Sequence, residues 1–204
     1  MSSVTGRRAA LAAERAKGAI SERTRASFDH LLARAWRSTM LAEGDSAEVV
    51  QIAEFPPKPK EKHAIVLTIA GYAMRVIVAL YFKLDADTRA HFERLNRVEP
   101  GTMDDQAFRD ALAECGNICA GALNRSLGEH FPHIGMSTPN LLSRESLAYA
   151  EVLGKGYQRH FQLSGLAQPY YASLYVVAYA DLDFAVDIEA EASADSDTGE
   201  LEMF

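Results

Sequence analysis

The segment from His63 to Phe82, HAIVLTIAGYAMRVIVALYF, constrains the fold more than any other part of the chain. It is rich in β-branched and aromatic residues, and one glycine, Gly71, interrupts it near its middle. Such side chains fit the pleated surface of a β-sheet, and a glycine between two such runs is typical of a turn. The segment therefore predicts a strand, a turn and a second strand.

Helical patterns lie on both sides of this hairpin. Residues 21–44 carry apolar side chains at helical spacing, and Ser21 can cap the start of that helix. After the hairpin, a short helix is expected to begin near Asp85. A long helix is expected over residues 105–127, where Gly128 stops it.

Three strand candidates follow the long helix, at residues 134–142, 156–163 and 169–184, and a short helix is expected at 144–152. The last strand candidate is long and partly alternates, as a central antiparallel strand does. A helix, a pair of strands, two helices and further strands, in that order, favour an α+β domain over alternating βα units.

The net charge of −7 is concentrated at the C-terminal end. Seven acids and no Lys or Arg lie between Asp187 and Glu202, which leaves 21 acidic residues against 21 basic ones elsewhere. Because a nearly neutral body offers no basic surface, we expect no nucleic-acid partner. We expect a mobile N-terminal extension over residues 1–20, one domain over 21–186 and a disordered acidic tail over 187–204.

No apolar run approaches the roughly 18 residues that a membrane span requires. The N-terminal segment has basic residues but no apolar core before a cleavage site, so it does not resemble a secretory signal. We therefore expect no membrane partner and a cytoplasmic location.

The cysteines and histidines do not form a metal-binding pattern. Cys115 and Cys119 lie one helical turn apart without further cysteines or clustered histidines, so we interpret them as buried apolar residues. The histidines that we interpret as scattered surface residues are His63, His91, His130, His133 and His160.

The long helix carries an unusual stretch, ECGNICAG, at residues 114–121, in which glycine and asparagine oppose helix formation. At about 100° per residue, the apolar side chains gather on one side of the helix. They are Phe108, Leu112, Cys115, Cys119, Ala122 and Leu123. The opposite side carries Asp110, Glu114, Asn117, Gly121 and Asn124. This polar side is either a solvated surface with a helix contact at the glycine or a functional site.

As a functional site, the polar side offers half of a hydrolytic centre. The amide of Asn117 does not titrate near neutral pH, but it can orient a water molecule by donating and accepting hydrogen bonds. Glu114, three residues earlier, offers a carboxylate that can pair with a lysine. Gly121 leaves the surface one turn above Asn117 open to a closely approaching partner. Since no nucleophile, metal cluster or phosphate-binding loop accompanies them, we expect a partner to supply the rest.

The pattern D-x3-E-x2-N, formed by Asp110, Glu114 and Asn117 and followed by Pro139 in a Ser-Thr-Pro segment, resembles the signature of the CheC/CheX/FliY chemotaxis phosphatases. The CheX branch is the most similar. The predicted hairpin is also similar to a strand–glycine–strand hairpin of that family, and the resemblance covers about residues 25–185. It implies an α+β fold in which two long helices pack on an antiparallel β-sheet.

The resemblance also implies a function and roles for residues. The chain would hydrolyse the aspartyl phosphate of a CheY-type response regulator, with Asn117 orienting the attacking water and Glu114 contacting the regulator's active-site lysine. Asp110 and Gly121 would support the motif, and Pro139 would be a structural match. Because the Mg²⁺ belongs to the regulator, the chain is expected to need no metal or cofactor of its own.

Two alternatives stand beside the phosphatase. The first is a non-catalytic module of the same fold, which binds a response regulator or acts as a scaffold. The second is a dimerisation domain, with a homodimer formed through the long C-terminal strand as a sheet edge. The acidic tail is a further candidate for gripping the regulator, since a tethered peptide raises the effective concentration of its partner.

Overall fold

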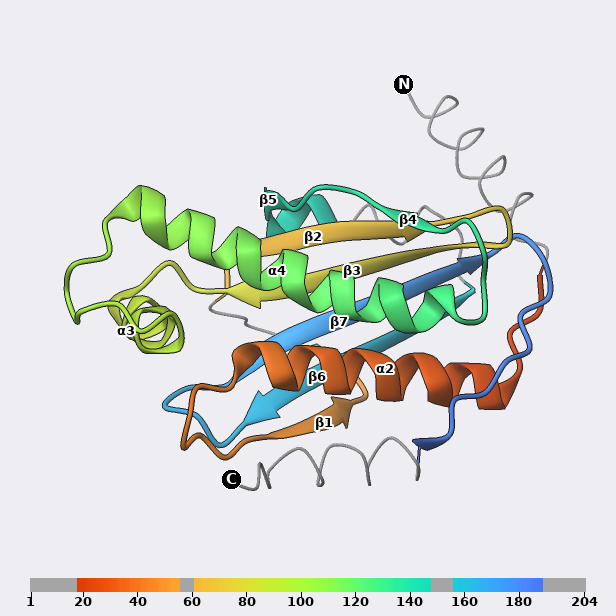
Figure 1. Ribbon diagram of the computed structural model, residues 1–204, viewed down its shortest axis with the longest axis horizontal. Helices are drawn as coiled ribbons and strands as arrows, with labels where there is room; N and C mark the ends of the chain where they lie inside the picture. Colours follow the sequence, from red (N-terminus) through yellow and green to blue (C-terminus); the bar gives the residue numbers. More distant parts are fainter. Residues whose placement is uncertain (1–17, 56–60, 148–155, 189–204) are drawn as a thin grey trace, which may run out of the picture.

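The computed structural model describes residues 18–55, 61–147 and 156–188 (Figure 1). An antiparallel sheet of seven strands forms its centre, in the order β1-β6-β7-β3-β2-β4, with β5 also pairing with β2. The strands are β1 (Glu48–Ile52), β2 (His63–Ala70), β3 (Met74–Phe82), β4 (Gly135–Met136), β5 (Asn140–Ser143), β6 (Tyr157–Ser164) and β7 (Tyr170–Ala178). Strand β1 therefore forms one edge of the sheet, and β4 and β5 together form the other.

The predicted hairpin is present as β2 and β3. The two strands pair from His63 opposite Phe82 to Ala70 opposite Arg75, and the Gly71 amide donates to the Met74 carbonyl at 3.0 Å to close the turn. Strand β3 pairs with β2 and β7 at its two edges, and its side chains are buried along almost its whole length in the clusters on the two faces of the sheet. The continuous run of apolar residues in β3 thus reflects a strand that is covered on both faces.

The described ranges contain three helices, α2 (Glu22–Met40), α3 (Ala86–Leu95) and α4 (Asp105–Gly128). Helices α2 and α4 lie on one face of the sheet, and the shorter α3 lies at one end of it (Figure 1). Each helix begins after a side chain that accepts a hydrogen bond from its first turn, as expected of an N-cap. These caps are Ser21, Asp85 and Asp104. The α+β class is confirmed, with α3 present in addition to the two helices on the sheet.

The main core fills the space between the helices and the sheet. Phe28 and Trp36 of α2, Leu112 of α4 and Phe161 of β6 are all buried there. Each such side chain stabilises the fold by roughly 1.5–3 kcal/mol relative to an exposed one. None of the helices in these ranges is long and apolar enough to cross a membrane.

A smaller cluster lies on the opposite face of the sheet. It joins Tyr81 and Leu147, with Phe55 and Tyr171 packed against them. Helices α2, α3 and α4 leave this face uncovered (Figure 1). The two faces therefore differ: one carries the helices, and the other carries an aromatic cluster that is open to solvent in part.

The strands differ from the expected ones in three places. Strand β7 lies between β6 and β3, so the long C-terminal strand is not a sheet edge and cannot form the dimer contact considered above. Strand β1 was not predicted, because a strand of five residues between polar segments gives little pattern to detect. The strand expected over 134–142 is split into β4 and β5 around Pro139, whose nitrogen cannot donate to a ladder.

The domain begins before residue 21. Ile20 is buried and forms a parallel bridge with Leu182, and the Leu182 amide donates to the Ala19 carbonyl at 2.8 Å. The last residues of the expected extension over 1–20 therefore belong to the domain, while residues 1–17 lie outside the described ranges. Most of the predicted acidic tail, residues 189–204, also lies outside them.

The short helix expected over 144–152 lies partly outside the described ranges as well. Residues 144–147 form a single helical turn directly after β5, and the remaining residues are not described. This turn carries Arg144 and Leu147 to the face of the sheet that lacks the long helices.

Candidate functional site

Helix α4 is held on the sheet by its apolar side, as its periodicity predicts. Phe108, Leu112, Cys119 and Leu123 are buried in the main core. Ala122, predicted on the same side, is only partly buried because it lines a shallow groove between α4 and α2. The position of this apolar side fixes which residues of α4 face outward.

Gly116 makes the closest approach between α4 and the sheet. A Cβ atom on this residue would lie 2.4 Å from Ile65 Cγ2 and 3.0 Å from Leu67 Cδ1 on β2. The first glycine of ECGNICAG therefore opposes helix propensity because the packing of the helix on β2 requires it. The sequence pattern did not assign this role to it.

Glu114 and Asn117 lie beside each other on the outward side of α4. Glu114 is exposed and Asn117 is half-buried, and Asn117 Nδ2 donates to Glu114 Oε2 over 3.4 Å. This distance is long for a hydrogen bond, so the amide can exchange the contact for one with water or with a partner at little cost. The pair is thus accessible together on one turn of the helix surface.

Asp110 and Gly121 flank the pair on the same side of α4. Asp110 is exposed, and its Oδ1 accepts a hydrogen bond from Gln106 Nε2 at 2.8 Å, so its carboxylate is engaged with the preceding turn. A Cβ atom on Gly121 would meet Arg125 Nη1 at 3.8 Å, which is an ordinary contact. Packing among the described residues therefore does not require glycine at position 121, and its role in admitting a partner stays a prediction.

Pro139 lies on the sheet rather than on the helix. It connects β4 to β5, and the pairing with β2 is continued beside it by Ser137. The Ser137 amide donates to the Thr68 carbonyl at 2.8 Å, and the Thr68 amide donates to Ser137 Oγ at 3.0 Å. The Ser-Thr-Pro segment therefore forms part of the sheet edge next to α4, consistent with a structural role for Pro139.

Ile118 is a surface residue that the sequence pattern did not single out. Its side chain is 50% exposed, directly after Asn117 on α4. The sequence could have indicated Ile118, because it is an apolar residue that lies outside the buried stripe of an amphipathic helix. Together, Glu114, Asn117 and Ile118 combine a carboxylate, an amide and an apolar contact on one surface.

The two cysteines are free and buried, which confirms their interpretation as apolar residues. Burial raises the pKa of the Cys119 thiol to about 12 and raises the pKa of Cys115 well above its usual value. Neither thiol is therefore an activated nucleophile. In the part of the chain that the structure describes, no group of three His, Cys, Asp or Glu residues could hold a metal ion.

The interpretation of the histidines as surface residues is wrong for His91, which is buried, and incomplete for His63 and His160, which are half-buried. His91 is buried, with its ring 5.3 Å from that of Tyr170, and burial together with Arg94 lowers its pKa. His160 is half-buried on the face of the sheet opposite α4, so the sheet separates it from Glu114 and Asn117. None of these three histidines belongs to the polar side of α4.

Comparisons with known proteins by sequence give no match. No protein-family model matches the chain, and no curated protein matches it either.

Solved structures do match the fold. A CheC-like superfamily protein from Shewanella sp. PV-4 is 12% identical, with a TM-score of 0.53, over 76% of this chain and 98% of that one. A CheC-like chemotactic protein from Shewanella oneidensis MR-1 is 12% identical, with a TM-score of 0.53, over 74% of this chain and 95% of that one. The chemotaxis protein CheX from Vibrio vulnificus is 14% identical, with a TM-score of 0.50, over 74% and 96%. The resemblance inferred from the motif is thus confirmed in the fold.

Proposed function

We propose that this chain, which has the fold of CheC-like and CheX proteins, accelerates hydrolysis of the aspartyl phosphate of a CheY-type response regulator. The observation that carries the proposal is the position of Glu114 and Asn117, side by side on the accessible surface of α4. The same two residues form the motif that resembles the signature of these phosphatases. The partner is an intracellular signalling protein, so the proposal keeps the expected cytoplasmic location.

Asn117 would act by positioning water. Its amide can donate one hydrogen bond to the phosphoryl group and accept another from the attacking water, which places that water in line with the scissile bond. Positioning contributes to catalysis without proton transfer by the side chain itself. The phosphoryl group and the Mg²⁺ would come with the regulator, so the proposed reaction uses no cofactor held by this chain.

Glu114 would fix the register of the two proteins. Its exposed carboxylate can pair with a lysine of the regulator. An exposed ion pair contributes only about 0–1 kcal/mol, whereas one that becomes desolvated at an interface orients the partners more strongly. Glu114 is therefore expected to affect both the affinity for the regulator and the placement of Asn117.

The direct test is release of phosphate from phosphorylated response regulators of the same organism, with and without the full chain. Wild-type protein should accelerate release from its cognate regulator, and Asn117→Ala should abolish most of the acceleration while preserving the fold. Asn140→Ala is the matched control, because Asn140 is an exposed asparagine on β5 rather than on α4. No acceleration of any regulator by the wild type would disprove the catalytic proposal.

The non-catalytic alternative is separated from this proposal by measuring binding and hydrolysis on the same samples. A scaffold would bind the phosphorylated regulator without changing the rate of phosphate release. A phosphatase would bind it and shorten its lifetime, and Asn117→Ala would retain binding while losing the rate effect. These two patterns cannot be confused with each other.

A further inference from the structure

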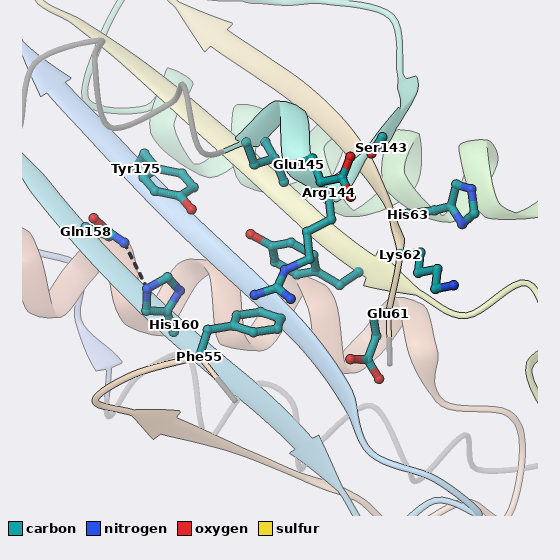
Figure 2. Close-up of a pocket in the computed structure, with 12 residues that line it drawn as sticks. Phe55, Glu61, Lys62, His63, Ser143, Arg144, Glu145, Gln158, His160 and Tyr175 are labelled. Atoms are coloured by element: carbon teal, nitrogen blue, oxygen red, sulfur yellow. Dashed lines mark hydrogen bonds between the residues drawn. The ribbon is translucent and has the colours of Figure 1, made fainter. Parts of the chain in front are cut away.

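A pocket of about 740 Å³ opens on the face of the sheet opposite α2 and α4. It lies over β6, β7 and β3, and its walls include Phe55, Tyr81, Arg144, His160 and Tyr175 (Figure 2). A volume of this size falls in the range of about 300–1,000 Å³ that is typical of small-molecule sites. The sheet separates this pocket from Glu114 and Asn117, so it is independent of the proposed phosphatase surface.

Aromatic rings form the apolar part of the pocket. The Phe55 ring lies 4.5 Å from that of Tyr81, 5.2 Å from that of Tyr171 and 5.9 Å from that of His160, measured between ring centroids. These rings come from segments that are far apart in the sequence. Their contacts hold a rigid apolar wall that a planar ligand could cover.

Arg144 places a positive charge against this wall. Its guanidinium carbon lies 4.2 Å from the centroid of the Phe55 ring and 5.8 Å from that of Tyr81. Figure 2 shows the side chain extending across the pocket toward Phe55. Among the described residues, no carboxylate lies within salt-bridge distance of this guanidinium. Its donors are therefore available to an anion.

The other charged groups around the pocket do not neutralise Arg144. Glu61 is buried and pairs with Lys83 at 3.8 Å, and Glu145 is exposed at the rim. Lys62 also lines the rim and adds positive charge. The balance of charge in the interior thus favours an anionic group over a cationic one.

His160 lines the pocket with an uncharged ring whose orientation is fixed by hydrogen bonds. Gln158 Nε2 donates to His160 Nε2 at 2.8 Å, so the proton of the neutral ring lies on Nδ1 and is donated to Ser173 Oγ at 2.6 Å. Burial, Arg144 and Arg159 all lower the pKa of His160, which keeps the ring neutral at pH 7. Both ring nitrogens are thus engaged, and Arg144 is left to bind the anion.

We propose that this pocket binds a small ligand in which a carboxylate or phosphate group is attached to a planar apolar ring. The guanidinium can hold the anionic group with two parallel hydrogen bonds. The ring would lie against Phe55 and Tyr175. The pocket would then be a ligand-binding site on the face of the sheet that the proposed phosphatase reaction does not use.

The test is titration of the isotope-labelled full chain, followed by amide chemical shifts. Benzoate and phenyl phosphate carry both features, benzamide carries the ring without the charge, and inorganic phosphate carries the charge without a ring. Benzoate or phenyl phosphate should bind with millimolar affinity or better, at least about fivefold more tightly than either control compound. The shifts should centre on Phe55, Arg144, His160 and Tyr175. Preference for the carboxylate or the phosphate identifies which anion the site takes.

Variants then assign the binding to the pocket. Arg144→Gln should weaken binding of the preferred probe by about tenfold or more, because the charge-assisted hydrogen bonds are lost. Arg75→Gln is the matched control, since Arg75 is exposed on the same face of the sheet outside the pocket, and it should leave binding unchanged. Absence of binding by both ring-bearing anions, shifts centred on α4, or equal binding by Arg144→Gln would each overturn the proposal. If Arg144→Gln does not fold, the test rests on the wild-type protein, in which the shifts must centre on Phe55, Arg144, His160 and Tyr175.

Discussion

Gly116 on α4 lies against Ile65 on β2 with no room for a methyl group between them. We predict that Gly116→Ala lowers the free energy of unfolding by up to about 2 kcal/mol, because overpacking costs about 1–3 kcal/mol and the gain in helix propensity offsets about 1 kcal/mol of that cost. Denaturant unfolding measures the change. Combining the substitution with Ile65→Ala should show a favourable coupling between the two sites, since the clashing methyl is removed. Additive effects would contradict the packing explanation.

Gly121→Ala should have the opposite effect on stability. Since a Cβ atom at Gly121 meets no close neighbour, we predict that the substitution is neutral or stabilises the fold by up to about 1 kcal/mol. If a response regulator approaches the helix at this position, the same substitution should weaken its binding several-fold. Unfolding and binding measurements on one preparation separate the two effects. Unchanged affinity would remove Gly121 from the proposed interface.

Asn117→Asp tests the amide with almost no change in shape. The new carboxylate would lie beside that of Glu114, where the amide nitrogen now lies 3.4 Å from Glu114 Oε2. We predict that acceleration of phosphate release falls about 10²-fold, because a second negative charge misplaces the water and repels the phosphoryl group. Steady-state phosphate release from the cognate regulator measures this. Activity retained at the wild-type level would show that Asn117 does not orient the water.

Ile118→Glu tests the apolar contact next to the pair. Ile118 is half-exposed, so the substitution should leave the free energy of unfolding within about 0.5 kcal/mol of the wild type. We predict that affinity for the phosphorylated regulator falls about tenfold or more, because a charge would be buried at the interface. Leu142→Glu is a suitable control, since Leu142 is a comparably exposed apolar residue on β5. Equal losses for the two variants would argue against a specific contact at Ile118.

The ion pair between Arg23 and Asp183 predicts a loss of stability in acid. Hydrogen bonds from Arg23 and Ser21 lower the pKa of Asp183 from 3.8 to about 2. A carboxyl whose pKa is lowered in the folded state stabilises the fold above its unfolded pKa and loses that effect as the pH falls through its folded pKa. Wild type should therefore be more stable than Asp183→Asn at pH 7, and the difference should shrink between about pH 4 and pH 2.

Denaturant unfolding of both proteins across this pH window measures the effect. At neutral pH, Arg23→Gln should lower the free energy of unfolding as Asp183→Asn does. A difference that does not depend on pH would show that the contribution of Asp183 is not electrostatic. The pair also connects the start of α2 to the segment after β7, so its loss should lower the stability of the domain itself.

Much of the local structure could be predicted because its causes lie close together in the sequence. The β2–β3 hairpin follows from two β-branched runs around Gly71, and α2, α3 and α4 begin at caps that the residues themselves indicate. The buried and outward sides of α4 follow from a period of 3.6 residues. The accessible position of Glu114 and Asn117 could be predicted for the same reason, whereas their catalytic roles stay predictions.

Other features could not be predicted, because their causes lie far apart in the sequence. Gly116 and Gly121 lie on the same helix, and only the distance from Gly116 to Ile65 shows that Gly116 is required for packing. The alternation within residues 169–184 favoured a central strand, but it could not show that the neighbours of β7 are β3 and β6. His91 of α3 is buried, and its ring packs against that of Tyr170, the first residue of β7.

The sequence by itself determined the hairpin, the helix starts and the outward polar side of α4, since propensity and periodicity act between residues within a few positions of each other. Only the tertiary structure decided the order of the strands, the packing role of Gly116 and the pocket that joins Phe55, Arg144 and His160. These features arise when distant segments bury their side chains against one another, and the free energy of that burial depends on the whole fold.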